Sequence, residues 1–309
     1  MKLTVGRRPD TPEDEYTGPP EVPCELKEKH YRGLDFPDLP NACKVHLDFL
    51  ERSSPRTSGL HVSDLGYTAD GGLCPRALWL REHGAEGAEP TWERKFGWRE
   101  GHIKEAWLAD MLAETVGDWH LERNLTADLV YTNGTVMTGE LDMLLTQPLG
   151  RQVILDAKCV EDQALARLDA PRPSNVCQMQ GYLMSHNADF GVLVYMGRWS
   201  VPRAFYVPRD DAATHRRMLE VYATAHSPEP PKVLAPKKIK GNVRKDGSRF
   251  LRLGLPWPCD YCPYLDTACD GALRPEHRNL GTLADLDKDG KVVNEVAGVD
   301  PQLLELLED

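Results

Sequence analysis

The spacing of apolar residues along the chain predicts helices in several segments. Apolar positions recur every three to four residues from about Asn41, and again over about Thr91–Glu114, Asn175–His186 and Asp210–Ala225. Two helix starts are indicated by Ser63-Asp64-Leu65, which is typical of a cap, and by Cys74-Pro75-Arg76, which places proline in a first turn. The predicted buried side of the longest helix carries Phe96, Ile103, Trp107, Leu108, Met111 and Leu112.

After that helix the period changes to two, which predicts strands. We expect them at Ala127–Tyr131, Thr135–Leu145, Gln152–Val160, Gly191–Tyr195 and Val201–Val207. Turns between the first three strands are indicated by Asn133-Gly134 and Pro148-Leu149-Gly150. The order helix, three strands, helix, two strands predicts an α/β fold with a mixed central sheet flanked by helices.

Composition separates a folded region from two polar ends. Residues 1–40 are rich in proline, glycine and charge and lack a period, which predicts a poorly ordered arm. Residues 41–270 contain the periodic segments and are expected to form one domain. Residues 271–309 form an acidic tail, in which residues 281–309 carry eight acids and two bases. Its end, Pro301–Asp309, predicts a short amphipathic helix that either packs on the domain or binds a protein partner.

The overall composition is that of a globular protein, with 41% hydrophobic and 28% charged residues. No stretch approaches the roughly 18 consecutive apolar residues of a membrane span, and the first residues lack the apolar core of an export signal. We therefore expect a cytoplasmic protein that has no membrane partner and keeps its eight cysteines reduced.

The formal net charge of −11 conceals a basic strip. Residues 237–252 carry seven bases and one acid, and Asp246-Gly247 predicts a hairpin turn within them. A local group of cations is what contact with phosphates requires, whatever the total charge of the chain. The candidate phosphate-binding or DNA-binding residues are Lys237, Lys238, Lys240, Arg244, Lys245, Arg249 and Arg252, although a charge run alone also fits a solvated face.

Two neighbouring predicted strands each present an acidic residue. Asp142 lies in one strand and Asp156 in the next, and Lys158 follows Asp156 on the same side of its strand. Two carboxylates make an oxygen-rich site suited to Mg²⁺ or Mn²⁺, and a lysine beside them orients a water or neutralises charge on a phosphoryl oxygen. The alternative interpretation of so short a pattern is a solvent-exposed face of an edge strand.

Two of the predicted helices carry further candidate residues. Gln178 and Tyr182 are four residues apart and therefore share a helical face, although such a pair alone also fits an amphipathic helix with a half-buried tyrosine. Upstream, the segment Gly101-His102-Ile103-Lys104-Glu105 offers another ligand on the helix that precedes the sheet.

Cysteines near the end of the domain have the spacing of metal ligands. Cys259, Cys262 and Cys269 form the pattern C-x2-C-x6-C, and a fourth ligand is sought in Cys74, 185 residues before Cys259. Thiolates suit both zinc and an iron–sulfur cluster, so the spacing alone leaves the metal open.

Taken together and in this order, the motifs of about residues 60–270 resemble the PD-(D/E)XK nuclease superfamily, and within it the RecB-like and Cas4-like exonucleases. The resemblance implies that Asp142 and Asp156 bind metal and that Lys158 places the attacking water. It implies a third metal ligand in the Ala157 carbonyl, and a DNA-contacting, site-shaping role for Gln178 and Tyr182. The family often has histidine four residues after the glycine of its first helix, where this chain has Glu105; we therefore expect Glu105 as the ligand and keep His102 in reserve.

The same resemblance implies a [4Fe–4S] cluster held by Cys74, Cys259, Cys262 and Cys269. The implied activity is that of a Mg²⁺- or Mn²⁺-dependent DNA exonuclease acting on single-stranded or end-containing DNA, in recombination, repair or CRISPR-like DNA processing. Two rival hypotheses are a zinc-stabilised endonuclease and a non-catalytic DNA-binding or assembly protein that retains the fold.

Overall fold

The structure is a computed structural model that describes residues 59–234, 237–240, 247, 249–269, 271, 284–286 and 292–295. The chain divides into two units, Met1–Thr57 and Ser58–Asp309, and every described residue belongs to the second. The predicted arm over 1–40, the helical pattern from Asn41 and the C-terminal helix over 301–309 lie outside the described residues.

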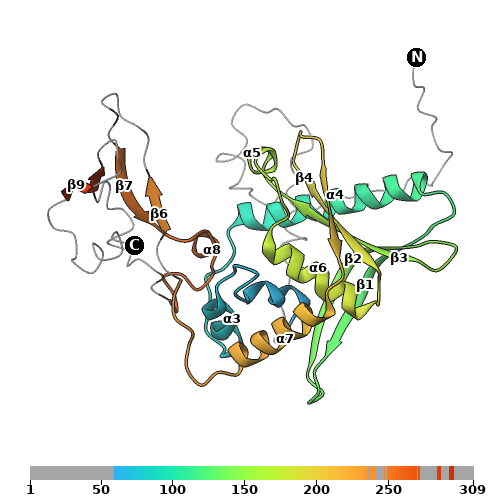
Figure 1. Ribbon diagram of the computed structural model, residues 1–309, viewed down its shortest axis with the longest axis horizontal. Coiled ribbons are helices and arrows are strands. Elements are labelled where there is room, and N and C mark those ends of the chain that lie inside the picture. The colour runs from blue at the N-terminus through green and yellow to red at the C-terminus, as the bar shows by residue number, and fades with distance from the viewer. Residues whose placement is uncertain are drawn as a thin grey trace, which may run out of the picture. The chain divides into compact units, whose positions relative to one another are not determined.

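A five-stranded mixed sheet forms the centre of the described chain (Figure 1). Its strands follow one another in chain order, and only β3 and β4 are parallel. The crossover between these two contains α5 (Asp162–Ala166) and α6 (Pro173–Ser185). The strands are β1 (His120–Val130), β2 (Val136–Thr146), β3 (Gln152–Cys159), β4 (Phe190–Met196) and β5 (Arg203–Pro208). The predicted α/β fold with a mixed sheet is therefore confirmed.

Turn residues set the register of the first three strands. Gly134 and Gly150 have φ angles of 83° and 86°, which L side chains rarely adopt, and their amides donate to Tyr131 and Gln147. Both predicted turns are confirmed. The first strand begins seven residues earlier than predicted, because β1 is an edge strand and its extra residues, 120–126, are exposed or only partly buried, so they lack the alternation of a half-buried strand.

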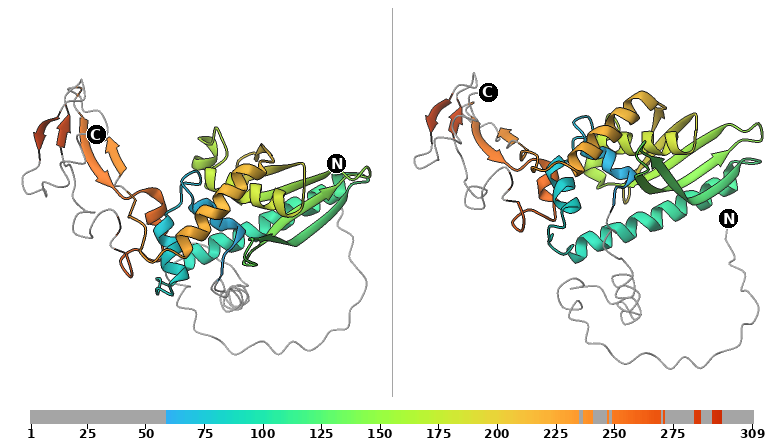
Figure 2. Two further views of the ribbon diagram at one scale, coloured as in Figure 1. Left: turned by 60° about the horizontal axis from the view of Figure 1, so that its bottom comes forward. Right: turned by 90° about the horizontal axis from the view of Figure 1, so that it is seen from below.

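Helices cover both faces of the sheet (Figure 2). On one face lies α4 (Trp92–Thr115), which begins after its cap Thr91 and buries Leu108 and Ala109 against β2, β3 and β4. On the other face, α6, α7 (Asp211–Ala225) and the 3-10 helix η1 (Val62–Tyr67) enclose the larger apolar core. Among the described residues, no helix is both long and apolar enough to span a bilayer.

The predicted buried side of α4 is largely wrong. Leu108 is buried and Leu112 partly so, but Phe96, Ile103, Trp107 and Met111 are exposed. The sheet covers only one stripe of this helix, and that stripe includes the small residue Ala109. The more apolar stripe therefore faces away from the sheet.

The N-terminal helix η1 starts one residue before the predicted cap at Ser63, because His61 is the residue that caps it. The buried carboxylate of Asp64 accepts the His61 amide and two hydrogen bonds from Arg81 of α3 (Pro75–Glu82), at 2.6 and 2.9 Å. A fully buried carboxylate requires such partners. The predicted start of α3 at Cys74-Pro75 is confirmed, with Cys74 as the cap.

Two glycines allow η1 to approach the sheet and α6 closely. A Cβ on Gly181 of α6 would lie 2.6 Å from Val62 and 2.7 Å from Leu65, and one on Gly139 of β2 would lie 2.9 Å from Val62. Val62 and Leu65 are fully buried, so neither can move aside into solvent.

We therefore expect Gly181→Ala to lower the free energy of unfolding by about 1–3 kcal/mol through overpacking, despite the helix propensity of alanine. Gly97→Ala in α4 is the matched control: nothing lies within 4 Å of its added Cβ, so this change should raise stability by up to about 1 kcal/mol. Urea unfolding of both variants measures the difference. Equal or higher stability of Gly181→Ala would contradict the close packing.

After α7, the segment 227–231 is hydrogen-bonded to α3. The Trp79 indole donates to the Ser227 carbonyl, and the Arg76 guanidinium donates to the Pro231 carbonyl. These two hydrogen bonds lead the chain back beside Cys74.

A second sheet, of order β6-β7-β8-β9, contains the basic strip. β6 (Lys237–Lys240) pairs antiparallel with β7 (Arg249–Gly254), which confirms the predicted hairpin. β8 (Ala284–Leu286) and β9 (Val292–Glu295), from the predicted acidic tail, continue this sheet. Arg244 and Lys245, and the side chains of Lys237, Lys238, Lys240, Arg249 and Arg252, lie outside the described residues.

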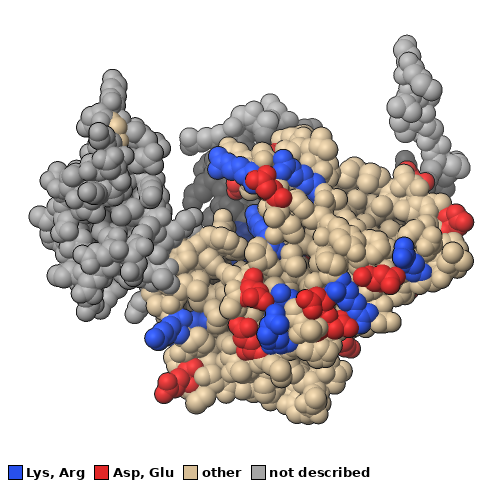
Figure 3. Space-filling view, viewed as in Figure 1, with Lys and Arg blue, Asp and Glu red and all other residues tan. Residues whose placement is uncertain are grey.

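On the face of the first sheet drawn in Figure 3, acidic and basic side chains alternate over α7.

Candidate functional site

The hydrogen-bonded ladder between β2 and β3 ends at the two predicted acids. Its last pair is Met143 with Leu155, so Asp142 and Asp156 occupy the first positions at which the strands separate. A carboxylate oxygen of Asp142 accepts the amide of Ala157 at 2.7 Å, in place of a backbone partner. On the far side of β2, Asn124 of β1 adopts a left-handed conformation (φ 53°), and the β1–β2 ladder skips its pairing with Asp142. The site is thus built where regular pairing is interrupted on both sides of Asp142.

From Asp156, a chain of polar contacts runs into α6. Lys158 Nζ lies 2.7 Å from Asp156 Oδ2 and donates to Gln178 Oε1 at 2.9 Å. Gln178 Nε2 donates to the Tyr182 hydroxyl at 2.8 Å, and that hydroxyl donates to the Glu140 carbonyl at 2.8 Å. Four of the sequence-predicted residues are therefore brought together, and the Glu140 carbonyl, which side-chain patterns do not reveal, completes the chain.

Asp156 is the most buried member of this group, with 1% of its surface exposed. Its Oδ2 contacts the lysine as an ion pair, but has no well-aligned hydrogen bond among the described residues. Burial alone would lower the pKa of Lys158, but the negative charges of Asp156 and Asp142 outweigh it and raise the pKa. The lysine therefore remains a cation at neutral pH.

The carboxyl of Asp142 is electrostatically unfavourable as an anion. Burial, followed by the negative charges of Asp156 and Glu105, raises its pKa to about 8, although Lys158 and the Ala157 amide act in the opposite direction. One lysine thus faces three acids. Such a site lacks positive charge, which is the condition that a divalent cation would satisfy.

On α4, Glu105 rather than His102 is turned toward the acids. The Glu105 side chain is mostly buried and its charge acts on Asp142, whereas the His102 side chain is 71% exposed and lies 3.5 Å from Glu105. This geometry favours the first choice made from the sequence over the reserve.

The donor types suit Mg²⁺ or Mn²⁺, since they are carboxylates with unbalanced negative charge. As the side chains lie, however, no three His, Cys, Asp or Glu residues of the described chain form a group that could hold a metal ion. The chemistry of the donors therefore fits a divalent cation, while a closed ligand set is not formed.

The raised pKa of Asp142 leads to a prediction about stability. Its carboxyl has a pKa of about 8 in the fold against 3.8 in a model compound, so the folded protein should lose stability as pH rises from about 4 to 8. Asp142→Asn removes this loss and still accepts the Ala157 amide. In EDTA at pH 8 we expect the variant to be more stable by on the order of 2 kcal/mol, with no gain near pH 4.

Urea unfolding across this pH range, with Asp128→Asn on the exposed side of β1 as control, measures the effect. A stability gap that does not widen with pH would contradict the electrostatic account of Asp142.

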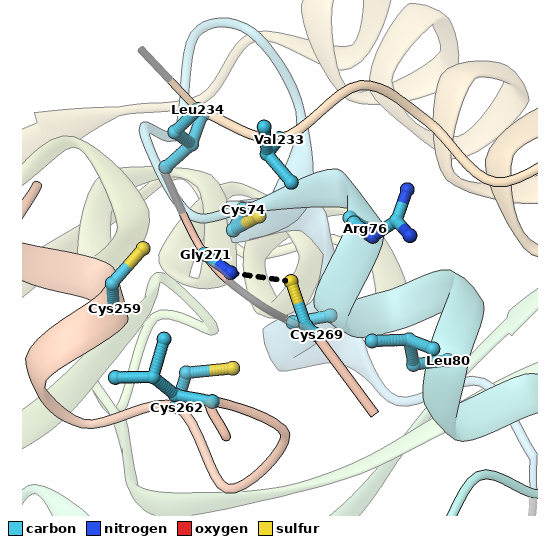
Figure 4. A pocket seen from close by; sticks show the side chains of 11 residues that line it. Cys74, Arg76, Leu80, Val233, Leu234, Cys259, Cys262, Cys269 and Gly271 are labelled. Carbon is cyan, nitrogen blue, oxygen red and sulfur yellow. Dashed lines mark hydrogen bonds between the residues drawn. The ribbon is translucent and has the colours of Figure 1, made fainter. Parts of the chain in front are cut away.

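The four predicted cysteine ligands line one pocket (Figure 4). Cys74 caps α3, Cys259 belongs to α8 (Trp257–Asp260), and Cys262 and Cys269 follow in the loop after α8. This loop is folded on itself: the Cys269 amide donates to the Tyr264 carbonyl, and Cys269 Sγ accepts the Gly271 amide at 3.3 Å. The long separation in sequence between Cys74 and the other three is therefore closed in space.

The rest of the pocket is apolar apart from Arg76, with Leu80, Val233, Leu234 and Leu265 among its lining residues. None of these four cysteines forms a disulfide, and among the described residues neither do Cys159 and Cys177. Burial, with smaller contributions from Cys74 and Cys269, raises the pKa of the Cys262 thiol. Four thiols in an apolar pocket fit a soft metal or cluster in ligand type, but here too the described side chains form no closed metal-binding group.

Comparisons with known proteins give only remote similarities. No family model matches the sequence, and no curated protein matches it. Among solved structures, SSO0001 is 17% identical with a TM-score of 0.48, over 79% of this chain and all of that one. An alkaline exonuclease from Laribacter hongkongensis is 16% identical with a TM-score of 0.40, over 54% of this chain and 85% of that one. A phage-related exonuclease from Haemophilus somnus is 16% identical with a TM-score of 0.38, over 55% of this chain and 93% of that one. These values are too low to assign a family or to transfer an activity.

Proposed function

We propose that the protein is a divalent-metal-dependent deoxyribonuclease that hydrolyses phosphodiester bonds, as an exonuclease on single-stranded or end-containing DNA. The observation that carries the proposal is the convergence of Asp142, Asp156, Lys158 and Gln178 where the β2–β3 ladder ends. The chemistry of these residues supports the proposal, because buried acids whose negative charge is not balanced lie beside one oriented lysine. The order of the motifs, which resembles that of PD-(D/E)XK nucleases, points to the same reaction.

In the proposed reaction, Asp142 and Asp156, with Glu105 and the Ala157 carbonyl, would hold Mg²⁺ or Mn²⁺. The bound ion would polarise the phosphate and lower the pKa of a water. Lys158, kept protonated by the acids, orients the attacking water and balances negative charge that develops on the phosphoryl oxygens. Gln178 accepts a hydrogen bond from Lys158 and so orients the ammonium group, and Tyr182 fixes the amide of Gln178.

We further propose that Cys74, Cys259, Cys262 and Cys269 hold a [4Fe–4S] cluster with a structural role. The proposal is supported by their ligand type and by the single pocket that they line. A cluster there would join α3 to the loop after α8, and its binding free energy would add to that of folding. Zinc in the same pocket is the competing proposal, because thiolates bind both.

The test uses the full chain, purified without oxygen. An absorbance spectrum with iron and zinc analysis identifies the metal in the cysteine pocket. Digestion of end-labelled and internally labelled DNA, single- and double-stranded, is then measured with Mg²⁺, Mn²⁺ or EDTA. We expect cleavage from ends that needs the divalent ion. DNA binding without cleavage in either ion would overturn the nuclease and favour the non-catalytic rival, while internal cuts and one bound zinc would favour the zinc-stabilised endonuclease.

A further inference from the structure

An exposed tryptophan stands at the carboxyl end of β4, in the loop that leads to β5. β3 and β4 are parallel, with Lys158 paired to Tyr195 and Cys159 to Met196. Trp199 follows Met196 by three residues, so it leaves the sheet at the same edge as the acids and the lysine, where Figure 1 also shows α5. Its surface is 88% exposed, an unusually large fraction for an aromatic side chain of this size.

The backbone that carries Trp199 is held firmly. The Asp162 carboxylate at the start of α5 accepts the amides of Trp199 and Ser200, at 3.1 and 3.0 Å, and the Ser200 hydroxyl at 2.6 Å. These hydrogen bonds, first that of the hydroxyl, lower the pKa of Asp162. Gly197 packs so closely that an added Cβ would lie 2.2 Å from the same carboxylate. An exposed indole on a rigid backbone loses little conformational freedom when a ligand covers it.

The neighbouring charges connect this loop with the acidic site. Arg198 contacts Glu100 of α4 at 3.3 Å, and Lys104 contacts the same carboxylate at 2.8 Å. Both cations contact the same carboxylate, so they lie together between the loop of Trp199 and α4. Phosphates of a strand that passes from the acids toward the loop would meet these two cations there.

We propose that Trp199 stacks on an unpaired base of the DNA strand whose phosphate lies in the acidic site, so that the site takes single-stranded DNA. The inference rests on the proposed nuclease function and specifies its substrate. A base in a duplex is already stacked on both faces, whereas a base in a single strand offers an open face to an indole. Stacking tolerates any sequence, so no base preference is expected from it.

The experiment measures binding of fluorescent single-stranded 12-mers to the full chain in EDTA, where cleavage does not occur. One abasic nucleotide is moved along the oligonucleotide. For the unaltered protein we expect one or two positions at which loss of the base weakens binding by about 10-fold. Trp199→Ala should weaken binding of the intact strand by about the same factor. For this variant, an abasic nucleotide at those positions should cause no further loss of affinity.

Two further variants separate stacking from general apolar contact. Trp199→Phe, which keeps an aromatic face, should retain most of the affinity, and Trp199→Leu should bind as weakly as Trp199→Ala. Trp107→Ala is the matched control, because Trp107 is also exposed, at 54%, but lies on the face of α4 that turns away from the sheet. Thermal unfolding should be unchanged in all four variants, since neither tryptophan is buried.

Unchanged affinity of Trp199→Ala, or additive losses from this variant and the abasic nucleotide at every position, would overturn the stacking proposal. So would an equal loss of affinity for blunt duplex DNA. The two proposals fail separately: a protein that cuts DNA without this coupling loses only the stacking role, and one that shows the coupling but never cuts loses only the nuclease function.

Discussion

Neutralising either member of the Asp156–Lys158 pair is expected to reduce DNA cleavage by about 100- to 1000-fold while binding of the strand is retained. Asp156→Asn removes a proposed metal ligand, and Lys158→Gln removes the cation that balances charge at the reacting phosphate. Asp156→Asn keeps the size of the side chain, and the amide of Lys158→Gln can still donate to Gln178 Oε1 or to Asp156. Single-turnover cleavage of a labelled strand, together with a separate binding measurement, distinguishes loss of chemistry from loss of affinity.

The matched control is Arg151→Gln, at the turn that joins β2 and β3. It lies at the opposite end of the same hairpin and also removes one positive charge, so cleavage should be unchanged. The double variant Asp156→Asn/Lys158→Gln should be little worse than either single variant, because the two groups act together. If either single variant cleaves DNA at the original rate, the assignment of both residues to a catalytic site is wrong.

Loss of Cys74 is expected to have the same consequence as loss of Cys262, although the two belong to distant parts of the sequence. If all four cysteines of the pocket hold one cluster, either alanine substitution opens a coordination position. The brown colour and nearly all iron should then be lost, and the free energy of unfolding should fall by several kcal/mol, on the order of 3 or more. Iron analysis and chemical unfolding, both without oxygen, measure the two effects.

Cys159→Ala is the control, because Cys159 is a free, half-buried thiol at the end of β3 and does not line the pocket. It should keep the full iron content. A Cys74→Ala protein that still holds four irons would refute this long-range ligand. If the unaltered protein is colourless and holds one zinc, and both pocket variants lose that zinc, the bound metal is zinc. The four cysteines then remain its ligands.

Local signals in the sequence predicted the elements of the fold well. The turn at Asn133-Gly134 and the helix start at Cys74-Pro75 are found as expected, because both depend on backbone preferences of the residues themselves. The convergence of Asp142, Asp156 and Lys158 was also readable, since strand alternation and a short hairpin determine it.

Features that depend on which neighbour covers which face were not readable. The most apolar stripe of α4 faces away from the sheet, because the contact with β3 is made by Leu108 and Ala109 rather than by Phe96 or Trp107. The departure of Asn124 from regular strand geometry, and the loop that presents Trp199, follow from long-range packing and from the carboxylate of Asp162. No period of hydrophobicity encodes either of them.

The connection between β3 and β4 determines the order in which the site can assemble during folding. Asp142 and Asp156 are joined by the tight β2–β3 hairpin, whose contacts are close in sequence and form early. Gln178 reaches Lys158 only after the chain has crossed through α5 and α6, and β4 has paired parallel to β3. We expect Asp142 and Asp156 to come together first, when this hairpin closes. Repulsion between their two carboxylates should slow the closure at alkaline pH. Refolding in EDTA should then be slower at pH 9 than at pH 6, and Asp142→Asn should remove much of that difference.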